Sequence, residues 1–180
     1  MVPEAPLDDT GTGLAPAGNG WFVVNAAEAQ WFDRGPRGMI CRFDGDGDLL
    51  FPEFGFHLFV LGPGEPMSMY HWEADQEDFL VLSGEATLIV EGEERPLRAW
   101  DFVHTPARAD HTIVGAGQGE CVVVAVGARI DSVGDDWGGY PVHEAAVKHD
   151  ASAERETTDP HEAYARFPDR KPTGYEGWLP

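Results

Sequence analysis

The sequence has few basic residues, few cysteines and no long uncharged apolar run. Lysine and arginine together number 12 against 32 aspartates and glutamates, which gives a formal net charge of -20 over 180 residues. A charge of this size repels phosphate backbones and anionic lipid surfaces, so nucleic acid is not an expected partner. No stretch approaches the roughly 18 apolar residues of a membrane span. The start of the chain also has no basic flank before an apolar segment, and we expect a cytoplasmic protein with no membrane partner.

The two cysteines, Cys41 and Cys121, are far apart, and each stands beside strand-like apolar residues. Two distant thiols suggest neither a disulfide framework nor a zinc knuckle. We therefore expect both side chains to be buried and reduced.

Short apolar runs rich in Val, Phe, Leu and Ile follow one another from Trp21 onward. They are interrupted about every eight to twelve residues by Gly, Pro and Asp, which is typical of an antiparallel sandwich or barrel. The runs are "WFVV", "MICRF", "FGFHLFVL", "MSMYHWE", "DFLVLSG", "EATLIVEG", "RPLRAWDFVH", "DHTIVGAG" and "GECVVVAVGAR". This pattern predicts an all-β fold.

Helical signal is confined to two short segments. The first, "NAAEAQWF" at residues 25–32, is weak. The second, "DPHEAYARF", is stronger, because Asp159 can cap a helix, Pro160 suits its first position and Glu162 stands three residues after the cap. Pro168 ends this segment, so we expect only short helices at the periphery of the fold.

The chain divides into three parts by composition. Residues 1–20 are rich in Gly, Pro, Ala and Asp without periodicity and are predicted to form a flexible N-terminal arm. Residues 21–130 are predicted to form a β-barrel. Residues 131–180 are predicted to form a C-terminal extension, with its short helix, that packs on the outside of the barrel.

The stretch "MYHWEADQEDFLVLSG" places a histidine and several carboxylates beside a strand that the protein must bury. Side chains two residues apart project to the same side of a strand, so His71 and Glu73 face one way. After the turn "ADQ", Glu77 opens a second strand that can return another ligand to the same cavity. His111 follows the polar turn "TPARAD" and can enter from a neighbouring strand. These four residues are candidate ligands of one metal ion.

The same residues resemble a known family, the cupins, which are small jelly-roll barrels that often hold one metal ion. Their first motif, G-x5-H-x-H-x3,4-E-x6-G, is nearly matched by "GEPMSMYHWEADQEDFLVLSG", with His71, Glu77 and the closing Gly84 in place. Their second motif, G-x5-P-x-G-x2-H-x3-N, is matched more loosely by "WDFVHTPARADHTIVG", in which Pro106 and His111 keep their spacing. The resemblance implies a double-stranded β-helix.

Departures from the two motifs change the expected metal chemistry. Glu73 stands where the second histidine belongs, Trp100 and Arg108 replace glycines, and Gly115 takes the final asparagine position. A carboxylate in place of an imidazole makes the ligand set harder and more negative, which suits manganese, iron, zinc or nickel better than copper(I). If both carboxylates bind, a divalent ion is neutralised. If Glu77 alone binds, open coordination positions remain, and Glu73 is free to act as a general acid or base.

Three further residues are predicted to line the pocket: His57, Phe79 and His104. Two classes of function remain open. The first is a metal-dependent enzyme, an oxidoreductase, isomerase or hydrolase, that acts on a small polar molecule. The second is a binding module that holds a sugar or acid without turnover. A metal-free epimerase-like cupin with a histidine as base is a third reading, because this scaffold carries many unrelated chemistries.

The segment from Trp21 to Phe43 offers strand-like, partly apolar material that a lone barrel of this size leaves exposed. Single-domain cupins commonly pair through sheet edges. We therefore expect a homodimer.

Overall fold

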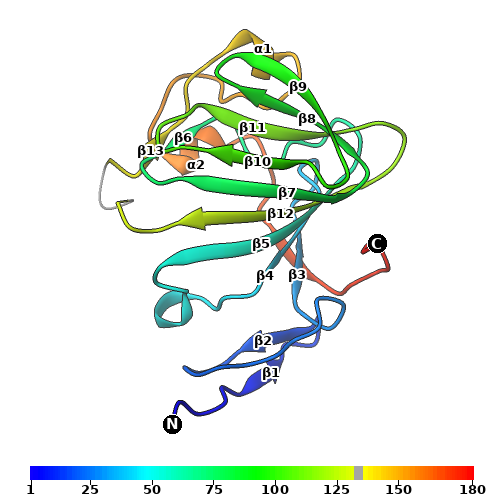
Figure 1. The fold of residues 1–180 in the computed structure, drawn as a ribbon, viewed down its shortest axis with the longest axis vertical. Coiled ribbons are helices and arrows are strands. Elements are labelled where there is room, and N and C mark those ends of the chain that lie inside the picture. Colours follow the sequence, from blue (N-terminus) through cyan, green and yellow to red (C-terminus); the bar gives the residue numbers. More distant parts are fainter. Residues whose placement is uncertain (132–135) are drawn as a thin grey trace.

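The structure, a computed structural model, describes residues 1–131 and 136–180 and is built mainly of antiparallel β-strands (Figure 1). The strands of the barrel are β3 (Trp31–Asp33), β4 (Met39–Arg42), β5 (Phe54–Leu61), β6 (Trp72–Glu73), β7 (Glu77–Ser83), β8 (Glu85–Val90), β9 (Glu93–Arg98), β10 (Phe102–Thr105), β11 (His111–Ala116) and β12 (Cys121–Ala128). The predicted all-β fold is confirmed.

Two sheets face each other across the core. Within the described residues, the larger sheet has seven strands in the order β10-β7-β12-β5-β4-β3-β14, where β14 is Lys171–Thr173. The smaller sheet has the order β11-β8-β9, and all of these pairs are antiparallel. The segment before β6 joins the smaller sheet through isolated bridges to β11.

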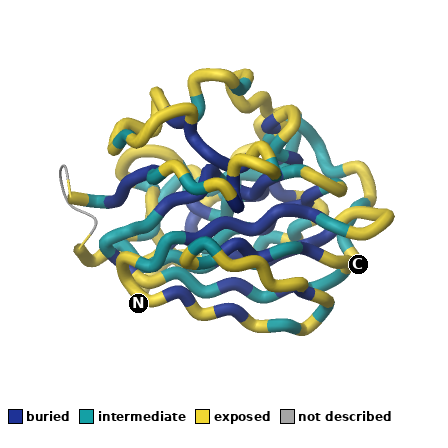
Figure 2. The backbone as a smooth tube through the Cα atoms, turned by 90° about the horizontal axis from the view of Figure 1, so that it is seen from above, coloured by how far each residue is buried: buried dark blue, intermediate teal, exposed yellow. Residues whose placement is uncertain are grey.

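The core lies between the inward faces of the two sheets. Phe79 and Val123 of the larger sheet pack in one buried cluster with Leu88 and Ile113 of the smaller one. Each such side chain contributes about 1.5–3 kcal/mol when it is fully buried. Figure 2 shows the result as buried segments in the middle of the strands and exposed segments at the rims.

The turn between β7 and β8 requires glycine. Gly84 has a φ of 76°, which side chains rarely adopt. A Cβ atom at this position would lie 2.3 Å from the backbone oxygen of Glu120, so no larger residue fits. This is the glycine that closes the first sequence motif.

The N-terminal part of the chain differs from its predicted secondary structure. Residues 1–20 contain a hairpin of β1 (Leu7–Asp9) and β2 (Leu14–Pro16). The run "WFVV" forms no strand: Trp21 makes an isolated bridge with Glu4, and the three residues that follow have no strand pairing with the described residues. The weak helix at residues 25–32 is also wrong: these residues form a turn that leads into β3. The flexibility of residues 1–20 stays a prediction.

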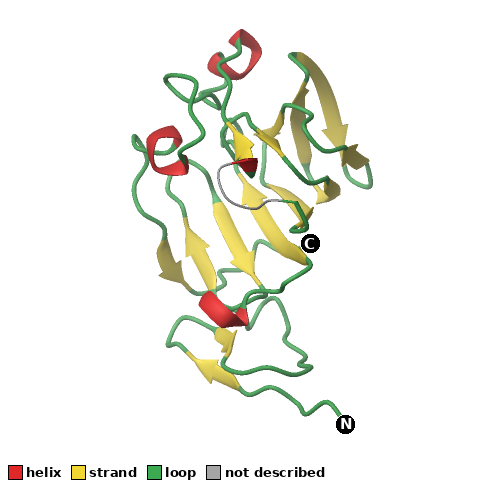
Figure 3. Ribbon diagram, turned by 90° about the vertical axis from the view of Figure 1, so that its left-hand side faces the viewer, coloured by secondary structure: helices red, strands yellow, loops and turns green. Residues whose placement is uncertain are grey.

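Short helices lie at the periphery of the sheets, as Figure 3 shows. They are η1 (Gly47–Leu49), α1 (Glu144–Val147) and α2 (Pro160–Ala163). The predicted cap of α2 is confirmed, because the Asp159 side chain accepts a hydrogen bond from the backbone N–H of His161. The sequence did not predict α1. No helix among the described residues is long and apolar enough to cross a membrane.

The C-terminal segment completes the larger sheet. β14 pairs with β3 and covers its outer edge within the same chain. A short strand, β13 (Gly138–Gly139), pairs with β6 beside the candidate metal ligands. Cys41 and Cys121 are both buried and free, as predicted.

Candidate metal centre

Two histidines face each other across an antiparallel bridge. The backbone N–H of His71 donates to the oxygen of His111 at 3.1 Å, and the N–H of His111 donates back to His71 at 2.7 Å. Residues that are directly opposite in such a pair share a face, which brings the two imidazole rings to a centroid distance of 4.8 Å. Both side chains are buried, with exposed fractions of 6% for His71 and 2% for His111.

Glu77, the first residue of β7, supplies the third side chain. Its Oε2 atom lies 3.0 Å from Nε2 of His111 and 3.4 Å from Nε2 of His71. One donor atom from each of the three residues lies within 4.8 Å of the others, so the group could hold a metal ion. The structure thus brings together three of the four predicted ligands.

The other ring nitrogen of each histidine is held by the backbone. Nδ1 of His71 lies 2.9 Å from the carbonyl oxygen of Met69, and Nδ1 of His111 lies 2.9 Å from that of Ala109. A carbonyl only accepts hydrogen bonds, so each Nδ1 carries the proton and donates it. When Nε2 is unprotonated, the ring presents the lone pair of that atom to the centre, as in metal-binding histidines.

Electrostatics of the group also fit a cation. Nε2 of His111 and Oε2 of Glu77 are buried atoms that make no hydrogen bond with any residue that the structure describes. Burial alone would raise the pKa of Glu77, but contacts with His111 and His71 outweigh it and hold that pKa below its usual range. Burial alone would lower the pKa of His71, yet its contacts with Glu73 and Glu77 raise it well above the usual value. A carboxylate and imidazole lone pairs that converge in this way are a donor set for a divalent ion.

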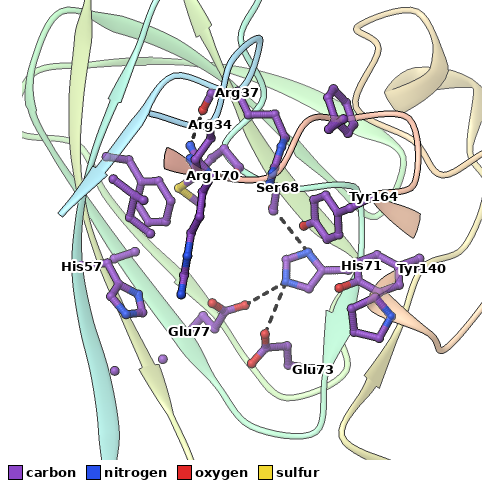
Figure 4. Close-up of a pocket in the computed structure, with 18 of the residues that line it drawn as sticks. Arg34, Arg37, His57, Ser68, His71, Glu73, Glu77, Tyr140, Tyr164 and Arg170 are labelled. Carbon is purple, nitrogen blue, oxygen red and sulfur yellow. Dashed lines mark hydrogen bonds and ion pairs between the residues drawn. The ribbon is translucent and has the colours of Figure 1, made fainter. Parts of the chain in front are cut away.

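Glu73 lies beside this group rather than within it. Its Oε1 atom is 3.5 Å from Nε2 of His71, and a quarter of the side chain, 25%, is exposed. Its carboxylate is not among the donor atoms that lie within 4.8 Å of one another. Figure 4 shows Glu73 and Glu77 on the same side of His71, so the predicted parity of His71 and Glu73 holds.

The group opens into a cavity of about 900 Å³. The barrel supplies part of the wall, including His57 and Ser68, and segments outside the barrel supply the rest. Burial lowers the pKa of His57 to about 4, with a smaller opposing effect from Asp44, so this ring is neutral at physiological pH. The prediction that His57 lines the cavity therefore agrees with its position.

The other two predicted pocket residues lie elsewhere. Phe79 is buried in the core, where its ring contacts that of His111 at a centroid distance of 5.5 Å. His104 lies outside the cavity: its side chain is 51% exposed, and its Nδ1 atom pairs with Oδ1 of Asp78 at 2.7 Å. The alternation of β10 explains this, because the neighbours Val103 and Thr105 are the buried residues of that strand.

Sequence reasoning missed the cavity residues that come from outside the barrel. The ring of Tyr140 stacks on that of His71 at 5.9 Å, and burial raises its pKa, so its phenol stays protonated. His161, the second residue of α2, also lines the cavity. Arg34 and Arg37 line it from the β3–β4 turn. The signal in the sequence is the segment "DRGPRG", a Gly- and Pro-containing turn that carries both arginines.

Comparison with known proteins identifies the fold family. The model of the cupin domain matches residues 57–127. The chain therefore contains a cupin domain at these residues. Among solved structures, this cupin is similar to a predicted oxalate decarboxylase from Thermotoga maritima, with 22% identity and a TM-score of 0.51 over 61% of this chain and 100% of the other. That likeness shows the fold. No match was found among curated proteins.

Two further structures are similar over parts of their length. One is a candidate sugar phosphate isomerase from Acidithiobacillus ferrooxidans, at 30% identity and a TM-score of 0.45 over 53% of this cupin. The other is a sugar phosphate isomerase of the cupin superfamily from Silicibacter pomeroyi, at 25% identity and a TM-score of 0.45 over 58%. This cupin spans 63% of the first protein and 62% of the second.

Proposed function

We propose that this cupin is a metal-dependent enzyme that moves a proton within a small polar substrate, as an isomerase does. In this proposal His71, Glu77 and His111 bind one divalent ion. Glu73 is the acid or base.

The position of Glu73 carries the proposal. A single buried carboxylate would suffice to complete a site with His71 and His111. A second carboxylate that reaches the same imidazole at 3.5 Å, but stays outside the converging group, is available for another task. Its partial exposure to the cavity lets it meet a bound molecule, which a general base must do within hydrogen-bond reach.

The chemistry divides between the ion and the protein. A bound divalent ion would polarise a carbonyl or hydroxyl oxygen of the substrate. Glu73 then takes a proton from the carbon beside that oxygen and returns it to a neighbouring atom, so the substrate is rearranged and the carboxylate is regenerated. Tyr140 and Tyr164 line the cavity beside His71, and their rings keep bulk water from the reacting group.

The ligand set favours manganese, iron, zinc or nickel among divalent ions, since it combines imidazole nitrogen with carboxylate oxygen. The same set of two histidines and one carboxylate also supports a second candidate function. This arrangement is used by non-haem iron oxygenases, in which open positions serve the substrate and oxygen. Tightly bound iron together with oxygen consumption would favour that function, whereas zinc or nickel would not.

Deuterium exchange tests the proposed proton transfer. The metal-loaded protein is incubated in D2O with a panel of small hydroxy acids, keto acids and sugar phosphates, and exchange at carbon is followed by NMR. We expect one class of compound to exchange with the parent protein and not with Glu73→Gln. His104→Gln is the matched control, because His104 is exposed and lies outside the cavity. Equal exchange by the parent and Glu73→Gln proteins would contradict the role of Glu73.

A further inference from the structure

The candidate metal cavity concentrates positive charge in a strongly acidic protein. Lysines and arginines number only 12 in the chain, against 32 acidic residues. Four arginines line this one cavity: Arg34, Arg37, Arg129 and Arg170. Among the described residues, three carboxylates line it, of which Glu73 and Glu77 lie at the candidate metal centre. The cavity is therefore far less negative than the rest of the molecule.

Arg129 and Arg170 have acidic partners. Arg129 pairs with Asp44 at 2.9 Å, and Arg170 lies 4.0 Å from Asp46. Arg34 and Arg37 differ from these two arginines in having no acidic partner in the described part of the chain. No carboxylate forms an ion pair with either of them among residues 1–131 and 136–180. These two arginines are the cations that a ligand could neutralise.

Arg34 is the more deeply buried of the two, with 5% of its surface exposed. Its Nη1 donates to the carbonyl of Met67 at 2.7 Å, Nη2 donates to the carbonyl of Arg37, and its guanidinium lies 4.8 Å above the ring of Phe59. These contacts fix the side chain without cancelling its charge. Its Nε is buried and has no hydrogen-bond partner among residues 1–131 and 136–180.

Arg37 stands next to it, held by aromatic rings. Its guanidinium carbon lies 4.6 Å from the centre of the Tyr164 ring and 5.1 Å from that of Phe167. Its Nε is also buried, and no described residue forms a hydrogen bond with it. Rings hold a guanidinium in a defined plane and leave its N–H edge available, which is the geometry for two-pronged recognition of a carboxylate or phosphate.

The proximity of two cations without a counter-ion is costly. Burial lowers the pKa of Arg34 to about 9, and the charge of Arg37 contributes to the same shift. Glu65 is the carboxylate that acts on Arg34 from a distance, but its Oε2 accepts a hydrogen bond from the backbone N–H of Gly62. An isolated buried charge costs several kcal/mol unless it is paired. An anion in the cavity would relieve this cost.

The arginines and the metal centre belong to one cavity. Figure 4 shows Arg34 and Arg37 on one side of His71, with Glu73 and Glu77 on the other. The backbone links the two ends directly: Met67 accepts the hydrogen bond from Arg34, and the next residue, Ser68, lies 3.5 Å from Nδ1 of His71. One small molecule can therefore contact both ends.

We propose that Arg37, supported by Arg34, binds an anionic group of the substrate, a carboxylate or a phosphate, while the other end of the substrate faces Glu73. The statement about the reacting end rests on the proposed function. The anion subsite rests on the two arginines, which lie outside the part of the chain that matches the cupin domain.

Anion binding to the full-length protein tests this subsite. Inorganic phosphate and malonate are titrated separately by calorimetry at constant ionic strength, both before and after removal of metal by a chelator. Arg37→Gln is the test variant, since Arg37 is half-buried on a turn and its loss leaves the core intact. Arg95→Gln is the matched control: it removes the same charge from an exposed residue that pairs with Glu93 on the surface.

We expect at least one anion to bind the parent and Arg95→Gln proteins equally, and Arg37→Gln about tenfold or more weakly. Arg37→Lys should recover part of the loss, because it restores the charge but not the planar fork. Tighter binding of phosphate would indicate a phosphate ester as substrate, and tighter binding of malonate would indicate an organic acid. Both results support the subsite.

Two results would overturn it. One is the absence of binding by either anion to the parent protein. The other is binding that chelation abolishes and Arg37→Gln leaves unchanged, since the anion would then sit on the metal. The proposed function can fail while the anion subsite stands. A protein that never binds metal but still binds anions through Arg37 would support the subsite and contradict the metal-dependent reaction.

Discussion

The Nε2 atom of His111 lies 3.0 Å from the Oε2 atom of Glu77, and neither atom makes a hydrogen bond with the described part of the chain. Both Nδ1 atoms of the histidine pair are already committed to backbone carbonyls. Two electron-rich atoms that face each other in a buried place need a proton or a cation between them. A divalent ion satisfies this need and also that of His71, which is why we place the metal here.

Glu73 distinguishes a three-ligand from a four-ligand centre. We expect Glu73→Gln to keep the metal content of the parent protein, because the Glu73 carboxylate lies outside the converging donor atoms. Elemental analysis after gel filtration measures this. Glu77→Gln, the same change at the proposed ligand, should lose most of the metal. Loss of metal in both variants would make Glu73 a fourth ligand.

His57 should make stability depend on pH. Burial, together with Arg42 and Arg129, lowers its pKa from 6.5 to about 4 and outweighs the opposing effect of Asp44 and Glu77. Between these values the unfolded chain binds more protons, so stability is complete above about pH 6.5 and falls toward pH 4. The shift corresponds to about 3 kcal/mol.

We therefore expect urea denaturation to show a smaller loss of stability between pH 7 and pH 4.5 for His57→Gln than for the parent protein. His104→Gln is the control, because the exposed ring of His104 pairs with Asp78 rather than lying unpaired in the cavity. Identical pH profiles for the parent and His57→Gln would show that His57 is not buried as a neutral ring.

Gly84 provides a test of the fold. Gly84→Ala combines a left-handed backbone with a clash against the Glu120 backbone, whereas Gly47 has a similar φ of 60° and open space around it. We expect Gly84→Ala to lower the free energy of unfolding by about 3 kcal/mol or more and Gly47→Ala by about 1 kcal/mol. Similar losses in both would mean that the β7–β8 turn does not approach Glu120.

The expected homodimer has a more specific form in light of the sheet order. β14 covers the outer edge of β3, so the free end of the larger sheet is β10. Trp100 and Phe102 are exposed at this end, at 74% and 66%. We expect light scattering to give about twice the monomer mass of 19.7 kDa, and a Trp100→Ser, Phe102→Ser variant to be a monomer.

Val23→Ser is the control for that experiment, because Val23 is also exposed but lies far along the chain from β10. A monomeric parent protein would contradict the dimer. A dimer that survives the double substitution would place the interface elsewhere.

The barrel and the grouping of the candidate metal ligands could be predicted because their signals are local. The spacing from His71 to Gly84 encodes a strand, a turn and a second strand, and parity within a strand decides which side chains share a face. The alternation of side chains along a strand also explains His104, which is exposed because its neighbour Val103 is buried. An apolar Val103 that faces the core therefore predicts that His104 lies outside the cavity.

The remainder depended on contacts between distant parts of the chain. Trp31 was read as the end of a weak helix, but pairing with β4 and with Thr173 of β14 makes it a strand residue. Arg37 reaches the cavity because Tyr164, far along the sequence, supplies the ring on which it packs. The pattern of apolar residues in either segment does not predict such a contact. Tertiary packing therefore overrides the local preference for secondary structure.

The metal content of the purified protein tests the central claim most directly. Protein prepared without added metal is analysed for bound ions, and its melting temperature is measured with and without a chelator. We predict about one divalent ion per chain and a lower melting temperature after chelation, because an ion that binds the folded state stabilises it. A His71→Ala, His111→Ala double variant should contain no stoichiometric ion and should not respond to the chelator. Full metal occupancy in that variant, or a parent protein that never binds a divalent ion, would contradict the account.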